Sequence, residues 1–204
     1  MQIRILCVLC AAVVGLSGCS GASAGAGGGT PPRTPSVARV SAASPSPTRT
    51  GPLTTGPGVR PGESPPVEPV SAAQHTVHGA ELSVTYYFEA LDWSIATLDP
   101  YLLHGLSSPS CGVCTSRIVT ITAFASTGIR VIGGRSRVPV VELESQSFRI
   151  KADEVFRVVA TQDAYEIVDR FGHVTSSVPA QTSSHAVFVS WVEGRWLVAE
   201  IGAA

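Results

Sequence analysis

The spacing of apolar residues predicts that the folded part of the chain begins with a helix. Six large apolar residues recur at intervals of three and four positions: Val84, Tyr87, Phe88, Leu91, Ile95 and Leu98. Polar residues take the opposite side: Glu81, Thr85, Glu89 and Asp92. This pattern is typical of an amphipathic helix, here of about 18 residues, with one apolar face turned toward a core.

Two further helices are indicated by their start and stop signals. Asp99-Pro100 supplies an N-cap followed by proline at the first helical position, so a short helix is expected from Tyr101 to about Gly105. Ser108-Pro109 repeats the same signal. We therefore expect a third helix from Pro109 to Gly128, a glycine that suits the position after a helix end.

Beyond Gly128 the period shortens to two and β-branched residues dominate, which predicts strands. The expected strand segments are 129–132, 137–144, 147–151, 154–162, 165–170 and 185–201, the last divided by a tight turn at Glu193-Gly194. A second turn is expected at 170–173. The predicted class is α+β, with three N-terminal helices packed on one face of a curved antiparallel sheet.

The chain starts with a different pattern, typical of an export signal. Arg4 precedes an apolar run, ILCVLCAAVVGL, that is too short to span a bilayer as a mature helix. The tetrapeptide that follows, Leu16-Ser17-Gly18-Cys19, resembles the lipobox of bacterial lipoproteins. The resemblance implies removal of residues 1–18 and acylation of Cys19, which would hold the protein in the lipid bilayer at the outer face of the cytoplasmic membrane. The alternative is an ordinary secretory signal, which would leave Cys19 as a free thiol.

Residues 19–76 are rich in Gly, Ser, Ala, Thr and Pro and carry little apolar surface. Such a segment cannot offset the entropy of ordering, so we expect a disordered tether. A Pro-rich ligand at Pro31–Pro35 is an alternative use of part of it. The expected organisation is thus a signal peptide (1–18), a lipidated tether (19–76) and an α+β domain (77–204).

Charge narrows the range of partners. The formal net charge is −1, charged residues make up only 14% of the chain, and Lys151 is the sole lysine. The arginines before residue 77 are spread out, so neither a nucleic-acid interface nor a polybasic membrane patch is expected.

Cys111 and Cys114 share the apolar stripe of the third helix. Outside the cytoplasm a disulfide is the expected state of such a pair. A thiol-exchange centre is an alternative, since a helix N-terminus lowers a thiol pKa. A metal site would need two more ligands at suitable spacing, and the five histidines are scattered. We expect neither a metal nor another cofactor.

The long aromatic helix with Tyr87-Phe88, the two helices after it and the strands ending in Trp191…Trp196-Leu197-Val198 resemble a known cone-shaped fold. It is shared by nuclear transport factor two, ketosteroid isomerase and the SnoaL-like cyclases, and is also called cystatin-like. The lipobox, the stalk, YYFEALDWSIATLD and Ser-Cys-x-x-Cys are together similar to an uncharacterised family of actinobacterial lipoproteins with a domain of unknown function.

A cone of this kind implies a candidate pocket, for which we single out Tyr87, Trp93, Asp92 and His104. Catalysis there would need a buried carboxylate or histidine with a shifted pKa and a hydrogen-bond donor. Each candidate also has an ordinary structural role, as a helix-core aromatic, a solvent-facing acid or a helix-end histidine. The sequence therefore favours a non-catalytic binding domain for an envelope protein or a small apolar ligand. A small-molecule enzyme and a thiol oxidoreductase are the alternatives.

Overall fold

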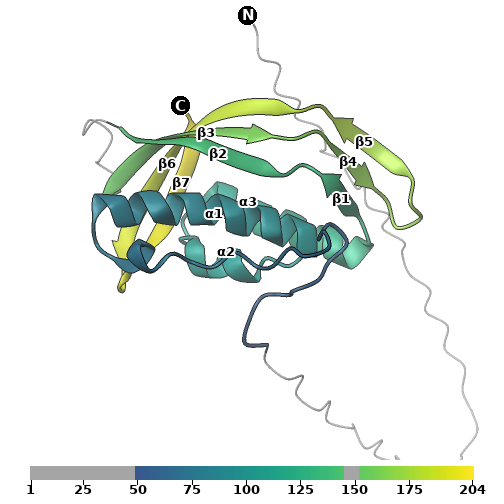
Figure 1. Cartoon of the computed structure of the whole chain (residues 1–204), viewed down its shortest axis with the longest axis horizontal. Helices are drawn as coiled ribbons and strands as arrows, with labels where there is room; N and C mark the ends of the chain where they lie inside the picture. The colour runs from purple at the N-terminus through teal and green to yellow at the C-terminus, as the bar shows by residue number, and fades with distance from the viewer. Residues whose placement is uncertain (1–48, 145–151) are drawn as a thin grey trace, which may run out of the picture. The chain divides into compact units, whose positions relative to one another are not determined.

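The computed structural model describes residues 49–144 and 152–204. The leader, Cys19, most of the expected tether and the strand expected at 147–151 lie outside the described residues. The described residues form one compact unit, in which three helices lie beneath a bent antiparallel sheet (Figure 1). The predicted α+β class and the order of helices before strands are confirmed.

The first two helices begin and end close to the predicted positions, whereas the third begins three residues later than expected, with Cys111 rather than Ser108 as its N-cap. A single 3-10 turn, η1 (Val70–Ala73), precedes α1 (Val77–Thr97), which starts after Thr76, whose Oγ1 accepts a hydrogen bond from the Gly79 N–H at 3.0 Å. The short α2 (Tyr101–Leu106) follows, and Asp99 Oδ1 accepts a bond from the Tyr101 N–H at 3.2 Å. The third helix, α3 (Gly112–Thr127), ends at Gly128 with φ +74°.

Within residues 49–144 and 152–204, seven strands follow the helices. They are β1 (Arg130–Gly133), β2 (Ser136–Leu143), β3 (Glu154–Gln162), β4 (Tyr165–Val168), β5 (Val174–Val178), β6 (Gln181–Val192) and β7 (Arg195–Ala203). They form a four-stranded sheet in the order β2-β3-β6-β7 and a three-stranded sheet in the order β1-β4-β5. All strand pairs within these sheets are antiparallel.

The smaller sheet continues the larger one. Its strands β1, β4 and β5 are separated only by short breaks from β2, β3 and β6 of the larger sheet (Figure 1). Gly133 and Gly134 lie at one break with φ +88° and +73°, and a Cβ on Gly133 would lie 2.6 Å from the Ala164 carbonyl oxygen. Glycine is needed there because the backbones approach closely in a conformation that side chains disfavour. These breaks let the sheet arch over the helices.

Two details of the strands differ from or refine the prediction. Strand β5 was not expected, because its sequence VTSSV has little apolar content and is largely exposed. Its pairing with β4 across the turn at 170–173 forms the strand. The turn between β6 and β7 is confirmed, since Glu193 and Gly194 both have positive φ, as a two-residue hairpin turn of this kind requires.

The compact unit begins before residue 77, the expected domain boundary. Residues from Arg49 onward run against the domain, and two buried tryptophans donate hydrogen bonds to backbone carbonyls in this segment. Trp93 Nε1 donates to Leu53 O at 2.9 Å, and Trp196 Nε1 donates to Gln74 O at 2.8 Å. Backbone carbonyls of this segment thus help to hold it against the domain, although it has few apolar side chains. Composition alone does not reveal such contacts.

Coverage from this segment explains why α1 is buried on more than one side. Its apolar stripe packs against the sheet around Tyr87, Phe156, Val158 and Val187. Tyr86, Trp93, Ala96 and Thr97 are buried as well. The simple amphipathic pattern therefore accounts for only one of the two surfaces that α1 buries.

Candidate functional site

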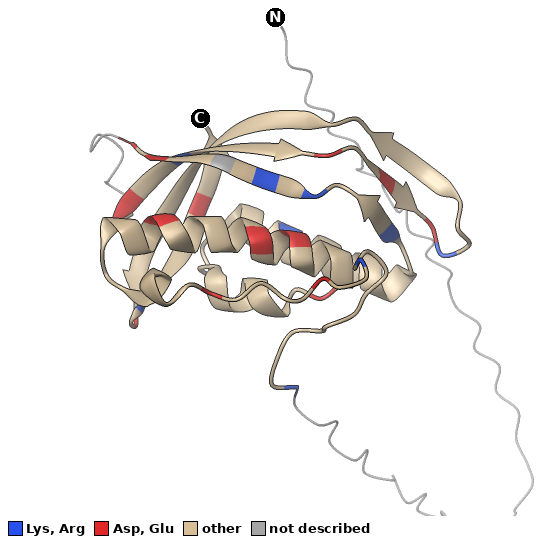
Figure 2. Cartoon of the chain, viewed as in Figure 1, with Lys and Arg blue, Asp and Glu red and all other residues tan. Residues whose placement is uncertain are grey.

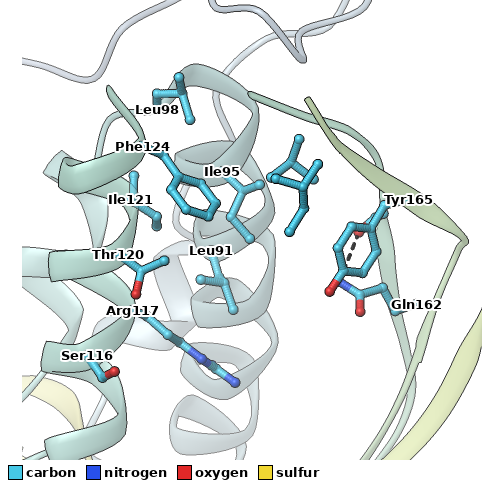
Figure 3. A pocket seen from close by; sticks show the side chains of 13 residues that line it. Leu91, Ile95, Leu98, Ser116, Arg117, Thr120, Ile121, Phe124, Gln162 and Tyr165 are labelled. Carbon is cyan, nitrogen blue, oxygen red and sulfur yellow. Dashed lines mark hydrogen bonds between the residues drawn. The ribbon is translucent and has the colours of Figure 1, made fainter. Parts of the chain in front are cut away.

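An apolar cavity of about 330 Å³ lies between α1, α3 and the smaller sheet. Figure 3 shows the side chains that surround it. Its lining residues are Leu91, Ile95 and Leu98 of α1 and its C-cap, Ser116, Arg117, Thr120, Ile121 and Phe124 of α3, and Val131, Gly134, Gln162, Tyr165 and Ile167 of the sheet side. The volume falls in the range of about 300–1,000 Å³ that is usual for small-molecule sites.

Helical spacing places the apolar lining. Leu91, Ile95 and Leu98 recur at i, i+4 and i+7, so they share one face of α1. Ile121 and Phe124 lie three residues apart on α3 and face them. The bend in the sheet places Val131 and Ile167, from β1 and β4, on the remaining side. The cavity therefore depends on the break that separates the two sheets.

Arg117 is the one charged residue in this lining. Its side chain extends from α3 past Leu91, at the end of the cavity away from Leu98 (Figure 3). Arg117 is half-buried, and within residues 49–144 and 152–204 no carboxylate forms an ion pair with it. An arginine side chain is a permanent cation in a protein.

Buried polar atoms also lie beside Arg117. Among the described residues, Tyr87 Oη, Ser94 Oγ, Ser107 Oγ and Arg117 Nη1 are buried without a hydrogen bond of good geometry. Burial raises the pKa of the Tyr87 hydroxyl, while the charge of Arg117 and hydrogen bonds from the side chains of Arg117 and Ser107 lower it. Neither Tyr87 nor Ser107 lines the cavity, so these groups lie on the core side of Arg117.

The charge of Arg117 also affects the pKa of His185 in β6. Burial lowers the pKa of His185, and the positive charge of Arg117 lowers it further. Ser183 Oγ lies 2.8 Å from His185 Nε2. A neutral His185 adds no second positive charge beside Arg117.

On the sheet side of the cavity, the amide of Gln162 already has a hydrogen-bond partner. Gln162 Nε2 donates a hydrogen bond to Gly134 O at 3.3 Å, which is drawn beside Tyr165 in Figure 3. This contact fixes the amide at the break between the two sheets. The remaining lining on that side is apolar or aromatic.

The four residues singled out from the sequence do not meet in this cavity. Tyr87 is fully buried in the core beside Arg117, and Trp93 is buried where it contacts Leu53. Asp92 lines a narrow crevice of about 10 Å³ at the sheet break, and His104 is exposed on α2. Tyr87 is the member of the set that lies next to the lining.

Asp92 has a structural partner across the helix–sheet boundary. Its Oδ2 accepts a hydrogen bond from the Ser136 N–H at 2.6 Å, and Arg135 Nη1 donates to the Asp92 carbonyl at 3.2 Å. Burial raises the pKa of Asp92 to about 6, and the bonds from Ser136 oppose that shift. Asp92 was expected on the solvent face, and its burial against the start of β2 follows from the arch of the sheet.

Cys111 and Cys114 form a disulfide, with their Cα atoms 5.2 Å apart. Cys111 is the N-cap of α3, where its Sγ accepts a hydrogen bond from the Cys114 N–H at 3.2 Å. The two residues are 1% and 0% exposed. Thiol exchange needs an accessible sulfur, so this burial supports the structural interpretation of the pair.

Arg117 is the residue that sequence reasoning missed. It is the only charged residue in the helix GVCTSRIVTITAFAST. A single charge among apolar and small residues was a usable signal, because charged groups are seldom buried without a specific reason.

Charged residues elsewhere on the domain are scattered. In Figure 2, α1 carries acidic positions, and both acidic and basic positions occur on the strands. In the described part of the chain, no helix is long and apolar enough to cross a membrane. No cluster of three or more His, Cys, Asp or Glu residues there is arranged to hold a metal ion.

The fold and the cavity define an α+β domain with an internal apolar site. The chain belongs to DUF6318, a family of unknown function, whose model matches residues 61–201. The match begins before residue 77 and so includes part of the segment that packs ahead of α1. A search of the curated proteins gives no match.

One solved structure with a related backbone is the intermembrane space region of the chloroplast protein ARC6. Its TM-score to this chain is 0.43 and its sequence identity is 14%. The alignment covers 64% of this chain and 99% of that chain.

Proposed function

We propose that this protein is a lipid-anchored, extracytoplasmic binding protein that takes a small apolar molecule into the cavity between α1, α3 and the smaller sheet. The cavity itself carries the proposal: about 330 Å³ lined mainly by aliphatic and aromatic side chains. Each buried CH₂ of a ligand contributes about 0.8 kcal/mol, so a compact hydrocarbon body supplies most of the binding free energy.

The anchoring part of the proposal rests on Leu16-Ser17-Gly18-Cys19 behind a short apolar run. We propose a lipoprotein of actinobacterial type, acylated at Cys19 and displayed at the outer face of the cytoplasmic membrane. Its test is Cys19→Ala with metabolic labelling by a fatty-acid analogue. Wild-type protein is expected to take up label and sediment with membranes. Equal labelling of the Cys19→Ala variant would remove the lipoprotein assignment.

The bent sheet arching over three helices supports a cone-type fold, in which the open end between helices and sheet is a natural binding place. Binding is favoured over catalysis by the charge within the cavity. A ketosteroid-isomerase type of site needs a carboxylate or histidine inside the cone. The lining here offers Arg117 instead, and the acid with a raised pKa, Asp92, lies in the adjoining narrow crevice, where it is bonded to Ser136.

The binding test uses a neutral fluorescent probe, N-phenyl-1-naphthylamine, with the mature protein carrying Cys19→Ser. Thr120→Trp places a large side chain in the cavity lining, whereas Val119→Trp adds the same group at a neighbouring position that is 60% exposed and outside the lining. We expect saturable probe fluorescence that Thr120→Trp reduces at least tenfold in affinity and Val119→Trp leaves unchanged. Absence of saturable binding, or equal effects of both variants, would refute the cavity as the site.

A further inference from the structure

The charge inside the cavity indicates the chemical class of its ligand. We propose that Arg117 binds the carboxylate of an apolar monocarboxylic acid, whose hydrocarbon body extends along Leu91 and Ile95 toward Leu98 and Phe124. This inference rests on the proposed function and adds to it the charge, the chemical group and the orientation of the ligand.

The first step is the unmet charge of Arg117. The guanidinium carries five N–H donors, its Nη1 is buried without a partner, and no described carboxylate pairs with it. Removing a charge from water without pairing it is costly, and the cost is recovered when a counter-ion binds. An anion is therefore the complement that this end of the cavity lacks.

Other arginines of the domain show the contrast. Arg135 is also largely buried, but it donates to Glu63 Oε2 at 2.5 Å and to the carbonyls of Asp92 and Gly58. Arg49 pairs with Asp99 at 2.7 Å. Arg135 and Arg49 thus receive acceptors from the chain itself, whereas Arg117 borders a cavity.

The second step is the geometry of the anion. A carboxylate matches the planar fork of a guanidinium with two parallel hydrogen bonds. Tyr87 and Ser107 lie beside Arg117 but outside the cavity lining, so the guanidinium is the group that meets the anion. A single cation that borders an apolar cavity suits one anionic head group better than a neutral hydroxyl.

The third step is the direction of the ligand. Figure 3 places Arg117 at one end and Leu98 and Phe124 at the other, with Leu91 and Ile95 between them. The lining between the ends is aliphatic and aromatic apart from Thr120 and the sheet-side amide of Gln162. A ligand with one charged end and one apolar end fits this polarity, and a dicarboxylate would place its second charge against Leu98 and Phe124.

The test compares decanoate with decanol by isothermal titration calorimetry, using the mature protein with Cys19→Ser below the micelle concentration of either compound. The two probes share a ten-carbon chain and differ in the charge of the head group. We expect decanoate to bind roughly 10- to 100-fold more tightly than decanol, as a charge-assisted hydrogen bond predicts.

Three variants assign the effect. Arg117→Met is expected to abolish the preference for decanoate and to leave decanol affinity within about twofold, while Arg117→Lys retains part of it. Arg130→Met removes the same charge from a half-buried residue of β1 that does not line the cavity, so it should keep the full preference. Circular dichroism establishes that each variant is folded.

The outcomes separate the two proposals. Equal affinity of wild-type protein for decanoate and decanol would refute the carboxylate inference and leave the apolar site in place. Loss of the preference in Arg130→Met as well as Arg117→Met would attribute it to net charge and also refute the inference. If neither compound nor the neutral fluorescent probe binds, both the proposed function and this inference fail.

Discussion

His75 stacks on Trp191 of the C-terminal hairpin, with ring centroids 4.8 Å apart and planes 7° apart. The neighbouring residue, Gln74, accepts the hydrogen bond from Trp196. The chain just before α1 is thus joined to the last two strands. These contacts join residues near the start of the folded unit to its last two strands. They show that the residues just before 77 belong to the folded unit.

A protein that begins at residue 77 should therefore be less stable than one that begins at residue 47. It loses the carbonyl partners of Trp93 and Trp196, the stack on Trp191 and the cover over α1. We expect a fall in the free energy of unfolding of at least about 2 kcal/mol, measured by urea denaturation. Equal stability of the two proteins would mean that the domain begins at 77, as composition predicts.

A substitution at Gly56 tests whether the segment before α1 packs tightly against that helix. A Cβ on Gly56 would lie 2.3 Å from Thr97 Cα, whereas a Cβ on Gly51 would meet nothing within 4 Å. Gly56→Ala should cost about 1–3 kcal/mol by forcing the segment away from α1. Gly51→Ala, as the control, should stay within about 0.5 kcal/mol. Thermal unfolding of both variants measures the difference, and similar small effects would show that the segment yields without cost.

Asp92 should make stability depend on pH. Its pKa is about 6 in the folded protein and 3.8 as an isolated side chain, so the folded state holds the proton more tightly. The stabilising contribution is present below about pH 4, declines as pH rises to about 6, and is absent above that value. The full shift corresponds to at most about 3 kcal/mol.

Asp92→Asn removes this titration and keeps an oxygen that can accept from the Ser136 N–H. Relative to wild type, the variant should gain stability as pH rises from 4 to 7, while the exposed control Glu89→Gln should show no such trend. Urea midpoints across this range provide the measurement. A difference between Asp92→Asn and wild type that is constant with pH would contradict the raised pKa.

The Cys111–Cys114 disulfide should be inaccessible and modest in its effect. It closes a ring of four residues, for which loop-closure entropy predicts about 2 kcal/mol. Both residues are buried, so alkylation after mild reductant should require unfolding. Cys111→Ser with Cys114→Ala replaces the N-cap sulfur acceptor by an oxygen, whereas the Ala/Ala pair has no acceptor there and should cost about 1 kcal/mol more. Rapid exchange with a thiol buffer in the folded protein would instead indicate a redox centre.

The helices could be predicted closely because their signals are local. Asp99-Pro100 and Gly128 mark real helix boundaries, and the stripe from Val84 to Leu98 marks a real buried face. The hairpin at Glu193-Gly194 was equally plain, because two strongly β-prone runs flank a turn that needs positive φ. Strand β5 escaped prediction because its only support is pairing with β4, a contact that its own residues do not announce.

The candidate site was predicted less well than the fold. Asp92 and Trp93 are on α1 as expected, but the direction of each side chain depends on the arch of the sheet and on the segment before α1. The lone charge of Arg117 in α3 was a signal that sequence reasoning passed over, but its position beside a cavity depends on packing that the sequence does not show.

The sequence by itself determined the α+β class, the order of the elements and the helix and hairpin boundaries, because these follow from periodicity and from the conformational preferences of residues near one another in the chain. Tertiary structure alone decided that residues before 77 cover α1, that the sheet breaks at Gly133-Gly134, and that an unpaired Arg117 borders an apolar cavity. Each of these depends on contacts between residues far apart in sequence, whose packing no local pattern encodes.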